Sequence, residues 1–169
     1  MVGVAECEST VVCVRRAVAS DVTALVELRS EMFRAMGTSG VEHPGWRRSA
    51  RDWFGSHLDD QQVCIVVVQV GTRVVSTAMA AIRDGVPSPG CPSGGDVLIS
   101  NVCTFPQARR KGRGQVAFAA VLDWARSTGV ARAELLATGD GLTMYEAAGF
   151  TATRYPAMRA SLSAAPDHP

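Results

Sequence analysis

The sequence predicts an α/β protein in which helices cover both faces of a mixed central β-sheet. Segments with the composition and alternation of strands take turns along the chain with segments that repeat apolar residues at helical spacing. The chain has 169 residues, of which 47% are hydrophobic, which suits one domain with a buried core and excludes a mainly disordered protein. We therefore expect the order β-α-α-β-β-β-α-β-α-β.

The first half of the chain predicts a strand, two helices and a hairpin. Ser20 and Asp21 offer a helix N-cap, and apolar residues then recur at helical spacing until Gly37 ends the run. β-Branched residues dominate the two segments that flank a short Gly-Thr turn. The expected elements are a strand at 11–17, helices at 22–36 and 46–58, and strands at 63–70 and 73–82.

The second half predicts a surface loop followed by alternating strands and helices. Residues 84–95 are rich in Gly, Pro and Ser, as surface loops are. Two later helices end at Gly129 and Gly149, where glycine suits a C-terminal cap. The expected elements are a strand at 97–105, a helix at 115–128, a strand at 133–137, a helix at 142–148 and a final β segment at 150–160. We expect one domain over 1–160 and a flexible tail at 161–169.

Composition excludes several classes of function. The formal net charge of +1 gives no global basic field, so nucleic-acid binding is not expected. Apolar runs such as that at 64–68 are too short to span a bilayer, so no membrane partner is expected. Five cysteines without a recognisable secretory signal predict reduced thiols and a cytoplasmic protein. His43, His57 and His168 lack metal-ligand spacing, so no metal is expected.

The most informative segment is the loop at 109–114, which follows an apolar strand that stops at Pro106. The loop is cationic and contains two glycines, and a helix pattern begins directly after it. Bare backbone N–H groups at a helix N-terminus, together with positive charge, bind anions, and glycine lets a phosphate approach the backbone closely. The loop therefore predicts a phosphate-bearing ligand.

Two other interpretations of this loop are open on the residues alone. It can be a solvated basic turn, because surface Arg/Lys runs are common. Residues 112–117 also match the dinucleotide pattern G-x-G-x-x-A, with Glu134 at a suitable distance. Against that, residues 106–111 separate the first glycine from the strand, and little chain follows Glu134. A nucleotide P-loop is excluded because the sequence contains no Gly-Lys-Ser/Thr.

The context of the loop resembles that of the GNAT superfamily of N-acetyltransferases. Residues 109–114 have the R-x-x-G-x-G form, Pro106 stands three residues ahead, and an amphipathic helix follows. Downstream, the segment 144–150, Met-Tyr-Glu-Ala-Ala-Gly-Phe, closes a short helix. The resemblance covers nearly the full chain, and it implies a single GNAT-type α/β domain that uses acetyl-CoA as acetyl donor.

The resemblance also implies how the donor is held. N–H groups of the glycine loop would bind the pyrophosphate, and the pantetheine arm would lie along free strand backbone at 102–104, beside a bulge. A backbone N–H there would be the oxyanion donor. The implied acetyl-CoA residues are Asn101, Val102, Cys103, Thr104, Arg109, Arg110, Lys111, Gly112, Arg113 and Gly114. Asn101 could bind pantetheine or acceptor, or satisfy the bulge, and Cys103 could act covalently or be a small buried thiol.

Tyr145 is the residue that the resemblance assigns to chemistry, as the acid that protonates the departing CoA sulfur. The alternative is a packing role for its ring. The base is less defined, because the strand carries Ser100 and Asn101 where many relatives place a glutamate. The only acid on that strand is Asp96, at its far end, so we expect a water chain that ends at Asp96 or at an acid of the first helix.

The acceptor site is expected under the first helices. Glu27 and Glu31 could form an acidic wall for a cationic amine, or simply a solvated helix face, and His43 could line the site or be an exposed loop residue. The predicted function is acetyl transfer to a primary amine of a small molecule, through a tetrahedral intermediate. Amino-sugar antibiotics (hence antibiotic resistance), polyamines and amino acids are open, as is a homodimer. The alternatives are a protein N-terminal or lysine acetyltransferase and a non-catalytic acyl-CoA sensor.

Overall fold

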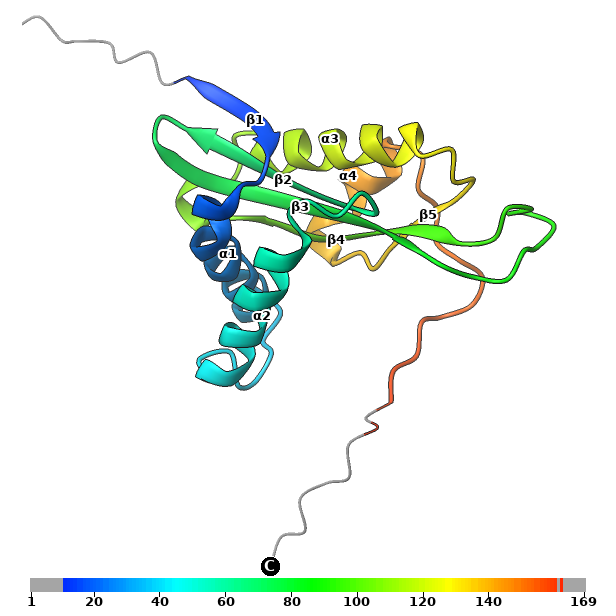
Figure 1. Ribbon diagram of the computed structural model, residues 1–169, viewed down its shortest axis with the longest axis horizontal. Coiled ribbons are helices and arrows are strands. Elements are labelled where there is room, and N and C mark those ends of the chain that lie inside the picture. The colour runs from blue at the N-terminus through cyan, green and yellow to red at the C-terminus, as the bar shows by residue number, and fades with distance from the viewer. Residues whose placement is uncertain (1–10, 161, 163–169) are drawn as a thin grey trace, which may run out of the picture. The chain divides into compact units, whose positions relative to one another are not determined.

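A five-stranded mixed sheet organises the computed structural model, which describes residues 11–160 and 162 (Figure 1). The strands lie in chain order: β1 (Val12–Arg16), β2 (Val63–Val70), β3 (Arg73–Arg83), β4 (Asp96–Thr104) and β5 (Ala133–Leu135). The first four pair antiparallel, and β5 pairs parallel with β4. The predicted α/β fold with a mixed sheet is confirmed.

Four α-helices complete the described part of the chain: α1 (Val22–Ala35), α2 (Pro44–His57), α3 (Arg113–Ser127) and α4 (Leu142–Ala147). Short 3₁₀ turns precede α1 and α4 and follow β4, at Ala19–Asp21, Gly139–Gly141 and Pro106–Ala108. The chain divides between Leu136 and Ala137 into two compact units, and α4 belongs to the second unit.

The core of the first unit lies on both faces of β2. α1 and α2 cover one face of the sheet and α3 covers the other (Figure 1). Strand side chains alternate between faces, so Val63, Ile65 and Val67 meet Leu25, Val26 and Phe54 of the two N-terminal helices, and the intervening residues face α3. Burying a valine or isoleucine side chain contributes about 1.5–3 kcal/mol. This is why β2 is a continuous apolar run.

The final β segment expected at 150–160 is wrong, because those residues form no strand. Pro156 has no N–H for a ladder, and the Thr153 hydroxyl donates to the Tyr155 carbonyl at 2.8 Å. Such local bonds compete with strand pairing. β5 likewise ends at Leu135, two residues before the predicted end. The tail expected at 161–169 lies outside the described residues except for Leu162, which is exposed.

Candidate functional site

Strand β4 carries the bulge that the family resemblance implied. Cys103 pairs with Thr77 of β3 and Ser100 pairs with Met79, so two β4 residues, Asn101 and Val102, lie opposite one β3 residue. Asn101 has a φ of 52°, in the left-handed region that asparagine tolerates better than most residues. A bulge of this kind bends the strand and redirects its side chains.

Beyond the bulge, β4 is paired with β3 alone among residues 11–136. Its parallel pairing with β5 involves only Val97, Leu98 and Ile99. The backbone at 100–104 therefore presents, on the side of β5, an edge that no strand of the first unit covers. Such an edge offers main-chain donors and acceptors to an extended ligand.

The loop after β4 ends in a helix N-terminus with open N–H groups. Gly112 is the N-cap of α3, with a φ of 71°, and no side chain caps the helix. The first α3 amide with a backbone acceptor is that of Val116, which donates to the Gly112 carbonyl at 3.0 Å. The three preceding N–H groups, on Arg113, Gly114 and Gln115, have no intrahelical acceptor and lie at the positive end of the helix dipole.

The geometry around Gly114 fits a phosphate at this position. A Cβ on Gly114 would lie 3.2 Å from the Thr104 hydroxyl oxygen, so the start of α3 closely approaches the end of β4. Arg110 and Lys111 are exposed beside it, and Arg110 also has a left-handed φ of 59°. Positive charge, open amides and a small residue at the closest approach suit the diphosphate that was predicted here.

Arg109 has a different environment from the rest of the loop. Its Nε donates to the Thr104 carbonyl at 3.1 Å, and its Nη2 lies 3.4 Å from the Glu31 carboxylate on α1. Both contacts attach the loop to the fold. Its predicted role as a phosphate ligand stays a prediction, and these contacts favour a positioning role instead.

Asn101 is 7% exposed, and its amide is engaged at the bulge. Its Oδ1 accepts a hydrogen bond from the guanidinium of Arg29 on α1, and its Nδ2 lies 3.6 Å from the Met79 sulfur. Arg29 also lies 4.9 Å from the ring centroid of Phe33. Burial lowers the pKa of Arg29.

Sequence analysis missed Arg29. Arg29 lies between Leu28 and Ser30, which are both buried. A basic residue between two such positions was the pattern that could have indicated a role for Arg29. A cation on a helix is nevertheless solvated in most proteins, and only the contact with β4 identifies this one.

Cys103 is buried beside the bulge, and burial raises the pKa of its thiol to about 11. A thiol with that pKa is protonated at neutral pH and a poor nucleophile. The environment therefore favours the small buried thiol over a covalent role. The neighbouring Thr104 hydroxyl forms a 2.8 Å hydrogen bond with the hydroxyl of Ser76, which also hydrogen-bonds the Cys103 carbonyl at 2.8 Å.

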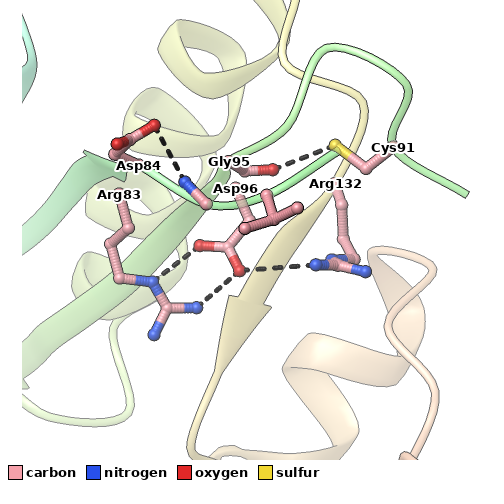
Figure 2. Close-up of a pocket in the computed structure, with 8 residues that line it drawn as sticks. Arg83, Asp84, Cys91, Gly95, Asp96 and Arg132 are labelled. Carbon is pink, nitrogen blue, oxygen red and sulfur yellow. Dashed lines mark hydrogen bonds and ion pairs between the residues drawn. The ribbon is translucent and has the colours of Figure 1, made fainter. Parts of the chain in front are cut away.

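Asp96 begins β4, and its carboxylate lies between two arginines (Figure 2). Arg83 donates to both carboxylate oxygens at 2.6 and 2.7 Å, and Arg132 lies 3.7 Å from one of them. Asn101 follows it by five positions, about 17 Å of strand. Asp96 stays a candidate base, but both of its oxygens are engaged in ion pairs far from the bulge.

The pocket beside Asp96 adds two local contacts. Its cavity of about 250 Å³ is also bordered by the loop before β4. There the buried Cys91 thiol donates to the Gly95 carbonyl at 2.9 Å, as Figure 2 shows. Outside the lining, Glu134 of β5 pairs with Arg83 at 2.9 Å.

Tyr145 lies on α4 in the second unit and is 8% exposed. Burial raises the pKa of its phenol. The ring meets Phe150 edge-on at 6.4 Å, and a Cβ on Gly141 would lie 2.7 Å from it. Gly149, with a φ of 93°, ends the helix so that the Phe150 N–H reaches the Tyr145 carbonyl at 3.0 Å. The motif at 144–150 thus has a structural basis in this helix end.

The residues predicted to line the acceptor site form a network with arginines. Glu27 pairs with Arg47 of α2. Glu31 lies 3.4 Å from Arg34 and 3.4 Å from the loop arginine described above. The acidic wall is therefore neutralised by guanidinium groups.

His43 is exposed, and its Nδ1 accepts a hydrogen bond from the Gly45 N–H at 3.1 Å, which caps α2. That contact favours the exposed loop histidine over a substrate ligand.

The described residues contain neither a metal-ligand cluster nor a membrane-spanning helix. Within residues 11–160 and 162, no group of three or more His, Cys, Asp and Glu side chains is arranged to hold a metal ion. No helix in the same residues is long and apolar enough to cross a bilayer.

The fold and this site define an α/β protein with a basic, glycine-containing loop between a bulged strand and a helix. The chain belongs to the acetyltransferase (GNAT) family, whose sequence model matches residues 22–150. The resemblance inferred from the two motifs is therefore confirmed, and acetyl-CoA is the acetyl donor that this family uses. No curated protein matches the sequence.

Solved structures share the fold at low sequence identity. A GCN5-related N-acetyltransferase from Ralstonia eutropha superposes with a TM-score of 0.78 at 22% identity, over 89% of this chain and 99% of that chain. A predicted acetyltransferase from Clostridium acetobutylicum, solved with acetyl-CoA, gives 0.78 at 19% identity, over 88% and 96%. The aminoglycoside N-acetyltransferase AAC(6')-Iy, solved with CoA, gives 0.72 at 16% identity, over 93% and 99%.

Proposed function

We propose that this protein transfers the acetyl group of acetyl-CoA to a primary amine of a small molecule in the cytoplasm. One observation carries the proposal: the uncovered edge of β4 at 100–104 leads directly into the three open N–H groups that begin α3. One segment of chain thus offers a strand edge for an extended amide-bearing arm and an anion site at its end. Residues 1–160 would form the catalytic domain.

In this proposal the chain holds the donor mainly through its backbone. The N–H groups of residues 113–115 bind the diphosphate, with Arg110 and Lys111 adding charge. The edge at 102–104 hydrogen-bonds the amide-bearing arm as a further strand would. An N–H of the same stretch donates to the oxygen that gains negative charge when the amine attacks.

The reaction requires two proton movements. The thioester supplies an activated acetyl group; a C–N bond forms to the neutral amine and the C–S bond breaks. The nitrogen then loses a proton, and the sulfur must gain one. Tyr145 is the proposed donor, on the family motif at 144–150. A phenol with a pKa of about 10 is a weaker acid than a thiol of about 8.5, and burial raises the phenol pKa further. Complete proton transfer from the Tyr145 phenol to the sulfur is therefore uphill. The phenol stabilises the sulfur most while the C–S bond is breaking.

The acids predicted to accept the proton from nitrogen are occupied by ion pairs. Asp96, Glu27 and Glu31 are all engaged with arginines. An amine needs only to be neutral to attack, so water is a sufficient acceptor if the amine is delivered in its free-base form. We therefore expect turnover to rise with pH as the acceptor amine loses its proton.

The test is release of free CoA from acetyl-CoA in the presence of a panel of amines, read with a thiol reagent. Enzyme of the proposed class releases CoA only with certain amines and yields the N-acetyl product by mass spectrometry. Binding of acetyl-CoA without release in any amine would identify the acyl-CoA sensor instead. Release only with peptide or protein acceptors would identify a protein acetyltransferase.

A further inference from the structure

Arg29 is a cation for which the described residues provide no carboxylate. Within residues 11–160 its guanidinium hydrogen-bonds the Asn101 side chain and lies over the Phe33 ring. No acidic group within residues 11–160 forms an ion pair with it. A guanidinium has five N–H donors in a planar fork, so most of its binding capacity at this place is unused.

The charged residues around Arg29, in contrast, are paired with one another. On the same helix and around it, three glutamates and three arginines form a closed network, namely Glu27, Glu31, Glu42, Arg34, Arg47 and Arg109. Arg29 stands outside that network and adds an excess positive charge next to the β4 bulge. Burial, which lowers its pKa, opposes this charge, and no carboxylate within residues 11–160 pairs with it to offset that effect.

The position of Arg29 connects this charge with the reaction. Asn101, its hydrogen-bond partner, is the bulge residue that precedes the stretch 102–104, where the proposed function places the thioester. Because Arg29 hydrogen-bonds Asn101, its guanidinium would contact an acceptor whose amine attacks a thioester held at 102–104. Arg29 would repel a polyamine or a polycationic amino-sugar, and it would attract an anionic group.

From these observations we infer that the acceptor is an amine that also carries a carboxylate, such as an amino acid, and that Arg29 binds this carboxylate. The inference rests on the proposed function, since it concerns the acceptor of the same site. Arg29 supplies two parallel N–H donors to the two carboxylate oxygens, while the Asn101 amide keeps the guanidinium in position. Arg29 is in this sense a specificity-determining residue.

Matched amines test the carboxylate directly. The panel holds the proteinogenic amino acids, their primary carboxamides and spermidine, and kcat/KM is measured for each with acetyl-CoA in excess. The amine of a carboxamide is less basic than that of the matching acid, so more of it is in the neutral form that attacks. Intrinsic reactivity alone therefore favours the carboxamides. Hydrogen bonds to charged groups contribute about 1.5–3 kcal/mol, so we expect about 10–150-fold preference for the acid of the accepted pair.

Three variants assign the preference to Arg29. Arg29→Gln should abolish the preference by raising KM for the acid, with kcat/KM for the carboxamide changed little. Arg29→Lys should retain part of it. Arg48→Gln removes an exposed arginine of α2 and should behave as the unaltered protein. Equal losses for acid and carboxamide in Arg29→Gln, or better turnover of carboxamides or spermidine by the unaltered protein, would overturn the inference.

A binding measurement separates this inference from the proposed function. Protein saturated with CoA is titrated calorimetrically with the amino acids and their carboxamides. Arg29-dependent binding of an amino acid without any CoA release would keep the carboxylate site and reject the transferase. CoA release with amines but no discrimination by charge would keep the transferase and reject the carboxylate site.

Discussion

The two halves of β4 differ in almost every physical respect. Residues 97–99 pair with strands on both sides, and the charge of Asp96, which precedes them, is matched by arginines. Residues 100–104 contain a bulge and a left-handed asparagine and pair with β3 alone in the first unit. No carboxylate within residues 11–160 forms an ion pair with Arg29, the cation beside them. One strand thus combines a half that pairs on both sides with a half whose second edge no strand of the first unit pairs.

This difference shows how a small sheet can provide a binding site with only a small loss of stability. A regular ladder satisfies its own backbone groups and leaves none for a ligand. The bulge interrupts the ladder once, and a single left-handed residue is a small cost of about 1–2 kcal/mol. We therefore expect the first half of β4 to serve the structure and the second half to bind ligand.

The largest effect is expected for Tyr145→Phe, which keeps the ring and removes the phenolic proton. If residues 100–104 hold the thioester and Tyr145 protonates the sulfur, single-turnover rates should fall by about 100-fold, the lower end for loss of a general acid because the transfer is uphill. Acetyl-CoA affinity should change little, since the proton is needed only as the sulfur departs.

The pH profile distinguishes this role from packing. Because burial raises the phenol pKa, Tyr145 stays protonated below pH 10, and its own titration should not limit the rate there. A Phe variant with normal single-turnover rates at every pH, or one with lower stability and normal rates, would assign Tyr145 to packing alone.

A second prediction concerns the loop that continues from the open half of β4. Gly112→Val adds a side chain beside the open amides and should weaken acetyl-CoA binding by more than about tenfold, which would remove most of the ligand-induced rise in Tm. Gly129→Val is the matched control, because Gly129 has a φ of 76° against 71° and open space around it. Both variants carry similar backbone strain, so both should lose similar stability without ligand.

Only Gly112→Val should lose the rise in Tm that acetyl-CoA causes, and Gly129→Val should keep it. Equal thermal shifts in the two variants would exclude a phosphate site at the loop. A shift with NAD but not with CoA in the unaltered protein would instead support the dinucleotide interpretation of residues 112–117.

Local patterns explain which parts were predictable from sequence. The strand at 63–70 was predicted to the residue, because an apolar run bounded by turns depends on nothing distant. The loop at 109–114 and the helix after it were predictable for the same reason, while phosphate binding there stays a prediction. The segment at 150–160 was wrong because its composition suggested strand although Pro156 and local hydrogen bonds prevented pairing.

The missed features of the site all depend on contacts between distant segments. Nothing local indicates that Asn101 adopts a left-handed conformation, because the bulge arises from the register between two strands. Arg29 becomes notable only through Asn101, and Asp96 becomes structural only through Arg83. A sequence gives the residue types at such places, while pairing and charge balance appear only when the chain is folded.

A third prediction tests the first half of β4. Asp96→Asn should cost about 2 kcal/mol of the free energy of unfolding, because two arginines lose a mostly buried carboxylate. The exposed pair of Asp123 and Arg126 provides the control, and Asp123→Asn should cost less than about 0.5 kcal/mol. Turnover should stay within about twofold in both. A much larger loss of turnover in Asp96→Asn, with the alkaline dependence of the rate abolished, would show that Asp96 is the base.

The smallest expected effect tests whether water reaches the interior of the second half of β4. Burial raises the thiol pKa of Cys103 from 9.0 to about 11, so the folded protein holds this proton more tightly than the unfolded chain. The resulting stabilisation is complete below pH 9 and is lost as pH rises toward 11, because the unfolded thiol ionises first. At pH 10 the loss is about 1 kcal/mol. Urea unfolding at pH 8, 9, 10 and 11 should therefore show a steeper decline in the unaltered protein than in Cys103→Ala, which lacks the thiol. A difference between the two proteins that stays constant over this range would mean that water reaches Cys103, and that the bulge exposes the interior of the strand as well as its edge.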